Sequence, residues 1–382
     1  MTAADAEFFD RLRLARTDGV GPITFRRLIQ RYGSAAAALD ALPALSRAGG
    51  RSAPPAPPAA DDIRRELDRL PRIGGKMLVW GDPDYPPLLA LLEDAPPALT
   101  VQGRLEKLHP RAVAIVGSRN ASANGQRFAE QLAESLARAG ITIVSGLARG
   151  IDAAAHLGGL AGGSTAACIA GGIDQPYPPE NAALQARIAE HGVVLAEAPW
   201  GTAPQARHFP RRNRIIAGLS LGVVVVEAAH RSGSLTTARM AQDAGRELFA
   251  VPGSPLDPRC RGSNGLIRDG AHLTESAQDV LDNLPDHPGR VGISRAPLFA
   301  RPEPPGFFEA AGDPDWLAPT SEGAVEQARA SLLELLSPEP TPIDDLVRRC
   351  HLSAAAVRVV LLELELAGRV QELPGGRVAL LL

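Results

Sequence analysis

Six short apolar runs, separated by stretches with helical periodicity, constrain this chain more than any other feature. The runs are continuous, as expected for strands that are covered on both faces of a sheet. The connections between them carry apolar residues at the spacing of a helical face. This alternation predicts an α/β fold built on a doubly wound parallel sheet, whose ligands bind at the carboxyl ends of the strands. The predicted strands are 113–116, 142–145, 165–169, 193–196, 222–226 and 247–251.

The segment before the core is predicted to be a small helical domain, residues 1–60, that ends in a linker. Residues 7–42 have helical patterning, interrupted by a Gly-Val-Gly turn at 19–21. This is a helix-hairpin-helix pattern, whose turn can offer N–H groups to a DNA phosphate. A single degenerate hairpin is weak evidence for DNA contact, so a plain helical turn packed on a neighbouring domain is the favoured interpretation. Residues 43–60 hold five prolines and are predicted to form a loose linker without helix or strand.

The core is predicted to span residues 61–284 and to be followed by a proline-rich linker, 285–324. Residues 325–382 then show three helical segments and a strand-turn-strand pattern, which together predict a winged helix. Its recognition helix, 353–367, carries Arg358 as its only basic residue, against two glutamates, and an apolar face rich in leucine and valine. We therefore expect this helix to serve protein contact or packing in preference to DNA binding.

Composition limits the class of protein. The 382 residues carry a net charge of −3, so any binding of nucleic acid must come from a local basic patch. Three scattered cysteines fit no zinc spacing and no disulfide framework, which indicates a reducing cytoplasm. The first residues are polar and acidic, unlike a signal peptide, and no run of about 18 apolar residues predicts a membrane span.

The loop after the first core strand has the geometry of an anion site. Gly117, Ser118, Arg119 and Asn120 follow the strand and precede a helix. A helix N-terminus beside backbone N–H groups at a sheet edge suits a phosphate, and Arg119 adds a permanent charge. The loop matches neither the dinucleotide fingerprint nor the P-loop.

Two further strand-end loops repeat this chemistry. The second strand ends in a loop with Gly146, Arg149 and Gly150, for which a tight turn with Asp152 as a helix cap and His156 packed on the surface is the alternative. The fifth strand leads to Ser232, Gly233 and Ser234, another candidate phosphate cradle at a helix start. The loop after the third strand carries Tyr177, which could stack on a base or pack in the core.

The strongest signal is a basic cluster after the fourth strand. No acidic residue occurs between Ala198 and Val226, and four arginines fall within the eight positions 207–214. Clustered guanidiniums need an anionic partner, and an aromatic ring among them suits a base. The alternative is a solvated basic face that pairs with Glu197 or Glu227, or a subunit contact. The candidate DNA-binding residues here are Phe209, Arg211, Arg212, Asn213 and Arg214.

Glycine loops at successive strand ends converge on one sheet edge, so a polyanion lying along that edge is the simplest ligand that uses them all. The sequence shows no Ser-His-Asp elbow, no His/Cys metal spacing and no carboxylate pair. We therefore expect a binding protein that needs no cofactor.

These motifs, taken in order, resemble the bacterial DNA-processing protein A family (DprA/Smf). The resemblance covers about residues 70–284 and rests on Val-Gly-Ser-Arg119, Ser-Gly-Leu-Ala-Arg-Gly-Ile-Asp152, Gly-Gly-Ile-Asp-Gln-Pro-Tyr-Pro178, Phe-Pro-Arg-Arg-Asn-Arg-Ile-Ile-Ala-Gly218 and Ser-Gly-Ser-Leu-Thr-Thr237. It implies an extended Rossmann-like core that binds single-stranded DNA, forms a homodimer and loads the RecA recombinase in natural transformation. It also implies that Gly117, Ser118 and Arg119 contact phosphate, that Arg211, Arg212 and Asn213 line the pocket, and that Phe209 touches a base.

Two other functions remain open from the sequence. The first is a nucleotide phosphoribohydrolase on the same sheet architecture, whose Pro-Gly-Gly-x-Gly-Thr motif is replaced here by Gly-Leu-Ser-Leu-Gly222 before Glu227. The second is an adaptor that uses the sheet edge for a protein partner.

Overall fold

The computed structural model describes residues 3–51, 55–109, 111–285, 322–350 and 352–381. These residues form two compact units. One contains the described residues up to 63 together with those from 322 onward, and the other contains residues from 64 to 285.

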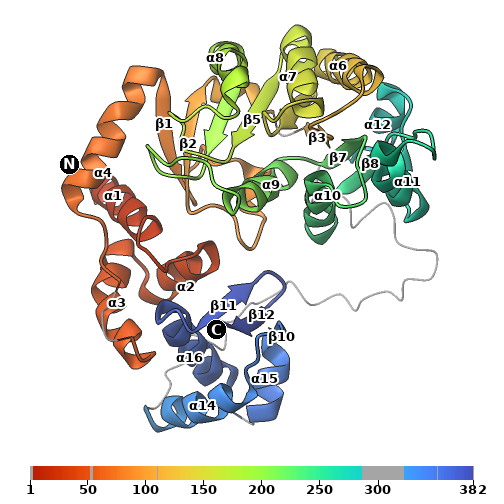
Figure 1. Cartoon of the computed structure of the whole chain (residues 1–382). Coiled ribbons are helices and arrows are strands. Elements are labelled where there is room, and N and C mark those ends of the chain that lie inside the picture. Colours follow the sequence, from red (N-terminus) through yellow and green to blue (C-terminus); the bar gives the residue numbers. More distant parts are fainter. Residues whose placement is uncertain (1–2, 52–54, 110, 286–321, 351, 382) are drawn as a thin grey trace. The chain divides into compact units, whose positions relative to one another are not determined.

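The larger unit is built on a sheet with the strand order β1-β2-β6-β5-β4-β3-β7-β8-β9 (Figure 1). Strands β3 to β9 run parallel to one another. All six predicted strands form, with ends that differ by at most one residue. They are β3 (Ala112–Gly117), β4 (Thr142–Ser145), β5 (Thr165–Ile169), β6 (Val193–Ala196), β7 (Gly222–Val226) and β8 (Glu247–Ala250).

The sequence patterns missed two of the three strands that extend the sheet toward its edges. On one side β1 (Gly75–Val79) and β2 (Ala98–Gly103) extend the sheet in the antiparallel sense. The apolar run between Lys76 and Trp80 predicts a short strand, which β1 confirms, but the polar residues Thr100 and Gln102 hid β2. On the other side β9 (His272–Leu273) is too short to produce a periodic signal. The sheet is therefore parallel from β6 to β9 and antiparallel at the edge formed by β1 and β2.

Helices cover both faces of this sheet (Figure 1). One core cluster joins strand residues such as Val113 and Ile115 to α6 (Ala123–Arg138), α7 (Ile151–Gly162) and α12 (Ala277–Asn283). The other joins Ala114 and Val116 to α9 (His208–Gly218) and α10 (Gly233–Asp243). Alternate side chains of β3 thus point to opposite layers. The remaining helices are α4 (Ala60–Arg69), α5 (Pro87–Ala90), α8 (Ala182–His191) and α11 (Arg261–Arg268), with 3-10 turns at Leu70–Ile73, Leu105–Lys107, Pro179–Asn181 and Pro258–Cys260.

The direction of winding changes at β3. The chain passes from β3 to β4, β5 and β6 on one side, and then crosses to β7, β8 and β9 on the other. The topological switch point therefore lies between β3 and β7, where doubly wound sheets commonly bind their ligands.

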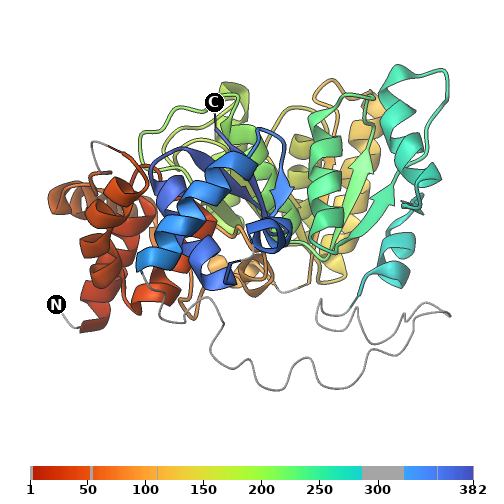
Figure 2. The same ribbon diagram turned by 90° about the horizontal axis from the view of Figure 1, so that it is seen from below.

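The smaller unit begins with three helices, α1 (Ala3–Ala15), α2 (Pro22–Tyr32) and α3 (Ala35–Ala48), drawn in red and orange in Figure 2. The expected hairpin of helices is present, but the prediction of a linker from residue 43 was wrong. Helix α3 continues through Pro43 as far as Ala48. Leu42 and Leu45 are buried on either side of the proline, and this burial outweighs the one backbone hydrogen bond that proline removes.

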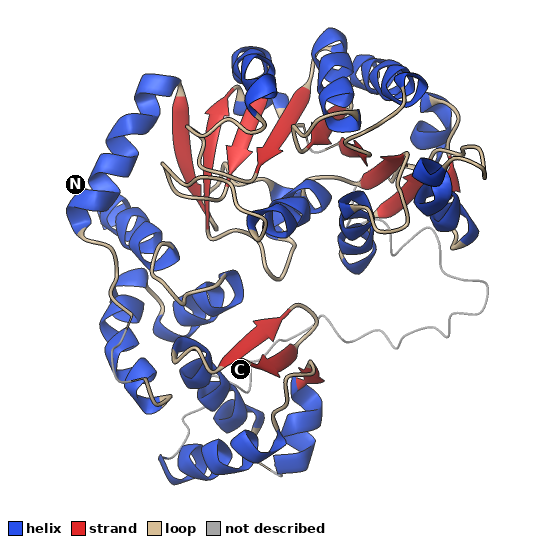
Figure 3. Cartoon of the chain, viewed as in Figure 1, coloured by secondary structure: helices blue, strands red, loops and turns tan. Residues whose placement is uncertain are grey.

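The rest of this unit is the predicted winged helix. It contains α14 (Glu322–Leu335), α15 (Ile343–Cys350) and α16 (Ala354–Leu366), with a small sheet in the order β10 (Thr341–Pro342), β12 (Arg377–Leu380), β11 (Val370–Leu373) (Figure 3). Most of the predicted linker, 286–321, lies outside the described residues, and residues 322–324 belong to α14. No helix of the described chain is long and apolar enough to span a bilayer.

Candidate functional site

A pocket of about 250 Å³ lies at the carboxyl ends of the central strands. Its walls come from the loops after β3, β4 and β5 and from the first two turns of α9. The lining residues are Arg119, Asn120, Gly146, Ala148, Arg149, Ile169, Ala170, Gly171, Gln175, Tyr177, Pro178, Phe209 and Arg212. The structure therefore brings three of the predicted loops together with the basic cluster, because neighbouring parallel strands end on the same edge of the sheet.

Hydrogen bonds between loops hold the pocket walls in place. The side-chain amide of Asn181 donates to the carbonyl oxygens of Leu147 and Ala148, at 2.9 and 3.2 Å. The backbone N–H of Ile151 donates to the carbonyl of Ser118 at 3.2 Å. Each bond ties one strand-end loop to another, so the walls are fixed before any ligand arrives.

Arg212 forms the floor of the pocket. Its side chain is buried, and its guanidinium passes over Gly146 so closely that a Cβ there would lie 1.2 Å from Nη1. Its nearest charged partner is the Asp152 carboxylate, 3.7 Å away, and neither Nε nor Nη1 has a hydrogen-bond partner among the described residues. A buried guanidinium with unsatisfied donors that faces a pocket is an incomplete anion site.

Burial disfavours the charged form of the titratable groups around Arg212. Burial raises the pKa of Asp152, although the charge of Arg212 opposes that shift. Burial lowers the pKa of His156 to about 3, so this histidine is neutral at pH 7, and it raises the pKa of the Cys168 thiol to about 12. His156 is fully buried and bonded to Thr165, so the alternative that packed it on the surface does not describe the structure.

Two aromatic rings border the pocket in different ways. Phe209 lies beneath the guanidiniums of Arg119 and Arg212, 5.0 and 5.8 Å from the ring centroid. Tyr177 meets Phe209 edge to face, with centroids 5.8 Å apart, and is 46% exposed. Phe209 thus orients two arginines through cation–π contacts, while Tyr177 offers the more open ring to a ligand.

The helix N-terminus after β3 is filled by the chain itself. At the switch point the carboxylate of Glu227, from the end of β7, accepts hydrogen bonds from the backbone N–H of Ser122, at 2.9 Å, and from its hydroxyl. The Ser122 hydroxyl in turn accepts from the N–H of Gly125 at 2.9 Å. A carboxylate already completes the N-terminus of α6, so the first turn of this helix does not have the open phosphate site that the sequence suggested.

The other predicted residues fall into three groups. Gly117, Ser118 and Gly150 frame the pocket loops without lining the cavity. Arg211 is exposed on α9, and Asn213 donates to the carbonyl of Gly233 at 3.4 Å, which places the Ser232–Ser234 turn beside α9. Arg214 is buried away from the pocket, where it donates to Glu197 and, at 2.7 Å, to the carbonyl of Asp94. For Arg214 the alternative of pairing with Glu197 describes the structure.

Sequence reasoning left several residues of this site outside the predicted binding set. Gln175, Tyr177 and Pro178 line the cavity from the loop after β5, and Asp152 contacts Arg212 from the start of α7. Their position directly after predicted parallel strands was the available signal, because such ends share one sheet edge. Among the described residues no cluster of His, Cys, Asp or Glu could hold a metal ion.

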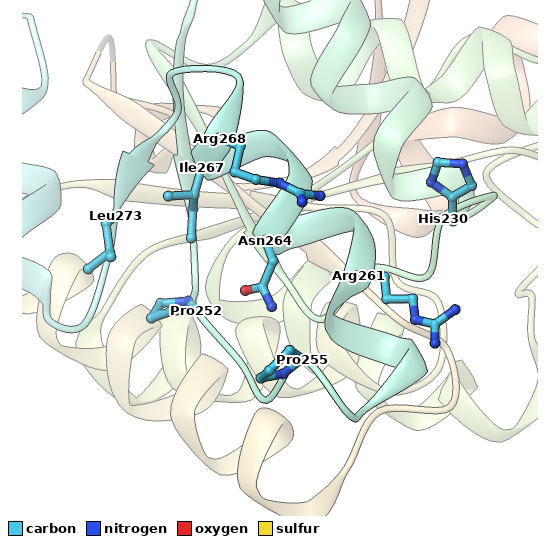
Figure 4. A pocket seen from close by; sticks show the side chains of 8 residues that line it. All are labelled: His230, Pro252, Pro255, Arg261, Asn264, Ile267, Arg268 and Leu273. Atoms are coloured by element: carbon cyan, nitrogen blue, oxygen red, sulfur yellow. The ribbon is translucent and has the colours of Figure 1, made fainter.

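A second cavity, of about 710 Å³, lies beside α11 (Figure 4). In this view His230 and Arg261 lie at one end, and Pro252 and Leu273 lie at the other. Asn264 stands between them, and its side chain exchanges two hydrogen bonds with the backbone of Gly253, at 2.8 and 3.0 Å. The polar group at its centre is therefore satisfied, unlike Arg212 in the first pocket.

Comparison with known families gives a match for each part of the chain. Residues 76–285 match the family described as DNA recombination-mediator protein A. Residues 5–68 match a DprA-like N-terminal HHH domain, and residues 317–376 match a DprA winged helix domain.

Individual relatives agree with these matches. The chain is 41% identical to protein Smf of Escherichia coli over 298 residues, which cover 78% of this chain and 75% of that protein. It resembles the crystal structure of DNA processing protein A from Streptococcus pneumoniae, with 42% identity and a TM-score of 0.57 over 60% of this chain and 80% of that one. It also resembles the Helicobacter pylori protein, solved to explain its single-stranded DNA binding mode, with 30% identity and a TM-score of 0.51 over 55% and 95% of the two chains.

Proposed function

The chain belongs to the DNA recombination-mediator protein A family, and from this premise we propose that it binds single-stranded DNA at the strand-end pocket. Arg212 is the observation that carries the proposal. It is a buried guanidinium whose Nε and Nη1 lack hydrogen-bond partners within the described chain, and it faces a pocket edged by Arg119 and Arg149. A DNA phosphate in this pocket would meet the charge of Arg212 together with those of Arg119 and Arg149. Arg149 can turn toward the same strand, because its pairing with Glu180 is a solvent-exposed ion pair of little worth.

Size and aromatic character favour a single strand over a duplex. At about 250 Å³ the pocket is smaller than the range of roughly 300–1,000 Å³ that holds drug-sized ligands, so it suits one nucleotide at a time. Tyr177 can stack only on a base that is free of its own neighbours. The exposed Arg211 and the Ser232–Ser234 turn continue the polar surface along α9 for the following phosphates.

We further propose that the bound strand is passed to the RecA recombinase during natural transformation and that the protein is not an enzyme. The phosphoribohydrolase alternative needs a catalytic glutamate near the end of β7. Glu227 stands there, but its carboxylate is committed to the N-terminus of α6. A recombination mediator requires binding without turnover, which agrees with a site made of arginines, backbone turns and aromatic rings.

The proposal includes a homodimer in the cytoplasm. Leu256 and Leu273 are 89% and 48% exposed, and Leu273 belongs to β9, the strand at the outer edge of the sheet. Apolar side chains at a sheet edge favour coverage by a second copy. The free thiols of Cys168, Cys260 and Cys350 suit a reducing compartment.

A salt-dependent binding experiment tests the site. Arg119→Ala combined with Arg211→Ala should weaken binding to a labelled oligothymidine several-fold at moderate salt. The dependence of affinity on salt should become shallower by about one counterion for each phosphate that the variant no longer binds. The thermal midpoint should remain near the wild-type value, since both side chains are exposed.

The matched control removes two exposed arginines from α6, Arg127→Ala with Arg138→Ala, and should leave binding unchanged. Equal losses in both double variants would mean that general charge, and not this pocket, attracts DNA. Preference for a duplex oligonucleotide of the same length would reject a single-strand site.

A further inference from the structure

Helix α16, the second helix of the helix-turn-helix in the winged helix, has two opposite apolar faces. Val357, Val360 and Leu364 point into the winged-helix core. At 3.6 residues per turn, Val359, Leu362 and Leu366 fall on the opposite side, and all three are buried although they lie outside that core cluster. A helix that is apolar on both sides needs a partner on both sides.

The second partner is the N-terminal helical domain of the same unit. Helices α3 and α16 pack against each other. Gly49, at the end of α3, approaches so closely that a Cβ there would lie 2.0 Å from the carbonyl oxygen of Glu363. Arg51 donates from Nη1 to the carbonyl of Leu366 at 3.3 Å, which satisfies one of the free carbonyls at the helix end.

A buried ion pair fixes the register of this packing. Both terminal nitrogens of Arg27, on α2, donate to the two carboxylate oxygens of Glu372, on β11. The side chains are only 18% and 3% exposed, respectively. Removing or reversing one partner leaves the other charge buried and uncompensated, so this pair discriminates strongly against other arrangements.

We infer that α16 is a docking helix, whose partner is the N-terminal helical domain of the same chain, and that it is closed to DNA in this state. A helix-turn-helix protein lays its recognition helix in the major groove with exposed polar side chains toward the bases. Here that helix contributes its outer face to α3 and its end to Arg51, and Arg358 is its only basic residue. Two domains separated by the whole core in sequence thus form one folded module.

Cleavage of the full-length chain tests this inference. A site-specific protease sequence is inserted between residues 300 and 301, the purified protein is cut, and the products are separated by native size exclusion. The fragment from 301 onward should co-elute with the fragment that ends at 300. Elution of the two fragments as separate species would overturn the inference.

Charge reversal identifies the surface responsible. Arg27→Glu or Glu372→Arg alone should release the C-terminal fragment from the cleaved protein, and the double reversal should restore at least half of the wild-type retention. Arg31→Glu, an exposed position on the same helix, is the matched control and should retain the fragment. Retention in both single variants, or its loss in the double reversal when far-UV circular dichroism shows folded fragments, would overturn the docking assignment.

Affinity for oligothymidine, measured on the same uncut variants, should change less than twofold. The binding measurement thus separates the two proposals, because the docking of α16 can be disproved while the DNA pocket is retained, and the reverse.

Discussion

Two neighbouring stretches of one sheet edge differ in the charge that the protein places there. Between β3 and β7 the chain supplies its own anion, since Glu227 accepts from the N–H and hydroxyl of Ser122. Over β4 and β5 the chain supplies a cation, Arg212, and leaves two of its nitrogens without hydrogen-bond partners in the described structure. The comparison teaches that a strand, a glycine loop and a helix do not by themselves make a ligand site. A ligand site also needs a charged group that the protein itself leaves without a full set of partners.

The same contrast recurs within two residues of α9. Arg214 donates to Glu197 and to the carbonyl of Asp94, and its guanidinium also lies 3.7 Å from the Asp94 carboxylate. Arg212 is also buried but faces a pocket with one distant partner. Arg214 therefore stabilises the fold, and Arg212 is held ready for a ligand.

The largest expected effect concerns Arg214. Arg214→Met breaks a buried pair and leaves Glu197 without this cation, which should lower the free energy of unfolding by about 3–5 kcal/mol. Urea denaturation followed by circular dichroism measures this loss. The protein that remains folded should bind oligothymidine with nearly wild-type affinity. A large binding defect in folded protein would place Arg214 in the DNA site after all.

Arg212 should show the reverse pattern. Arg212→Met removes the charge from the pocket floor and should weaken oligothymidine binding by about 30- to 100-fold, or about 2–3 kcal/mol, as for the loss of charge-assisted hydrogen bonds. Arg212→Met should lower the free energy of unfolding less than Arg214→Met does. The carboxylate that it leaves unpaired, Asp152, has a raised pKa and can become neutral by taking up a proton. Fluorescence anisotropy and urea denaturation on both variants separate the two roles. Equal effects of the two substitutions on binding and on unfolding would show that Arg212 and Arg214 do not have different roles.

Glu227 tests the other side of the comparison. Glu227→Gln removes the negative charge from the N-terminus of α6 and should lower the free energy of unfolding by about 1 kcal/mol, the usual size of such a helix-dipole interaction. Oligothymidine affinity should stay the same, because the glutamate lies at the switch point and not in the pocket. A marked gain in affinity would show that a phosphate can enter the α6 N-terminus once the carboxylate is neutral.

These contrasts also mark what the sequence could predict. Local patterns were enough for the six central strands, since each is a buried apolar run, and for the meeting of the strand-end loops, since parallel strands end on one edge. Strand β2 was missed because its pattern is partly polar, and the end of α3 was misplaced because Pro43 outweighed the buried leucines beside it. Glu227 as a cap was unpredictable because its partner Ser122 lies 105 positions away. The different fates of Arg212 and Arg214 likewise depend on residues that only the tertiary fold brings near.

The smallest expected effect is a pH dependence of the pocket itself. Asp152 lies 3.7 Å from Arg212, and burial raises the pKa of its carboxyl above the ordinary value of 3.8. As the pH falls toward that pKa, protonation removes the competing negative charge, so DNA affinity should rise. Asp152→Asn should bind a few-fold more tightly at pH 7 and should lose this part of the pH dependence.

Two histidines complete the interpretation of that titration. His156 contributes nothing above pH 5, because its pKa is lowered to about 3. The pKa of His208, at the start of α9, is lowered by partial burial and by Arg207 and Arg211, so His208 also gains charge only below the ordinary range. Anisotropy titrations between pH 5 and 8 are therefore made on the wild type, on Asp152→Asn and on the latter variant with His208→Gln added. If the wild type and Asp152→Asn show the same slope, Asp152 does not titrate against the DNA, and Arg212 faces the phosphate at constant charge.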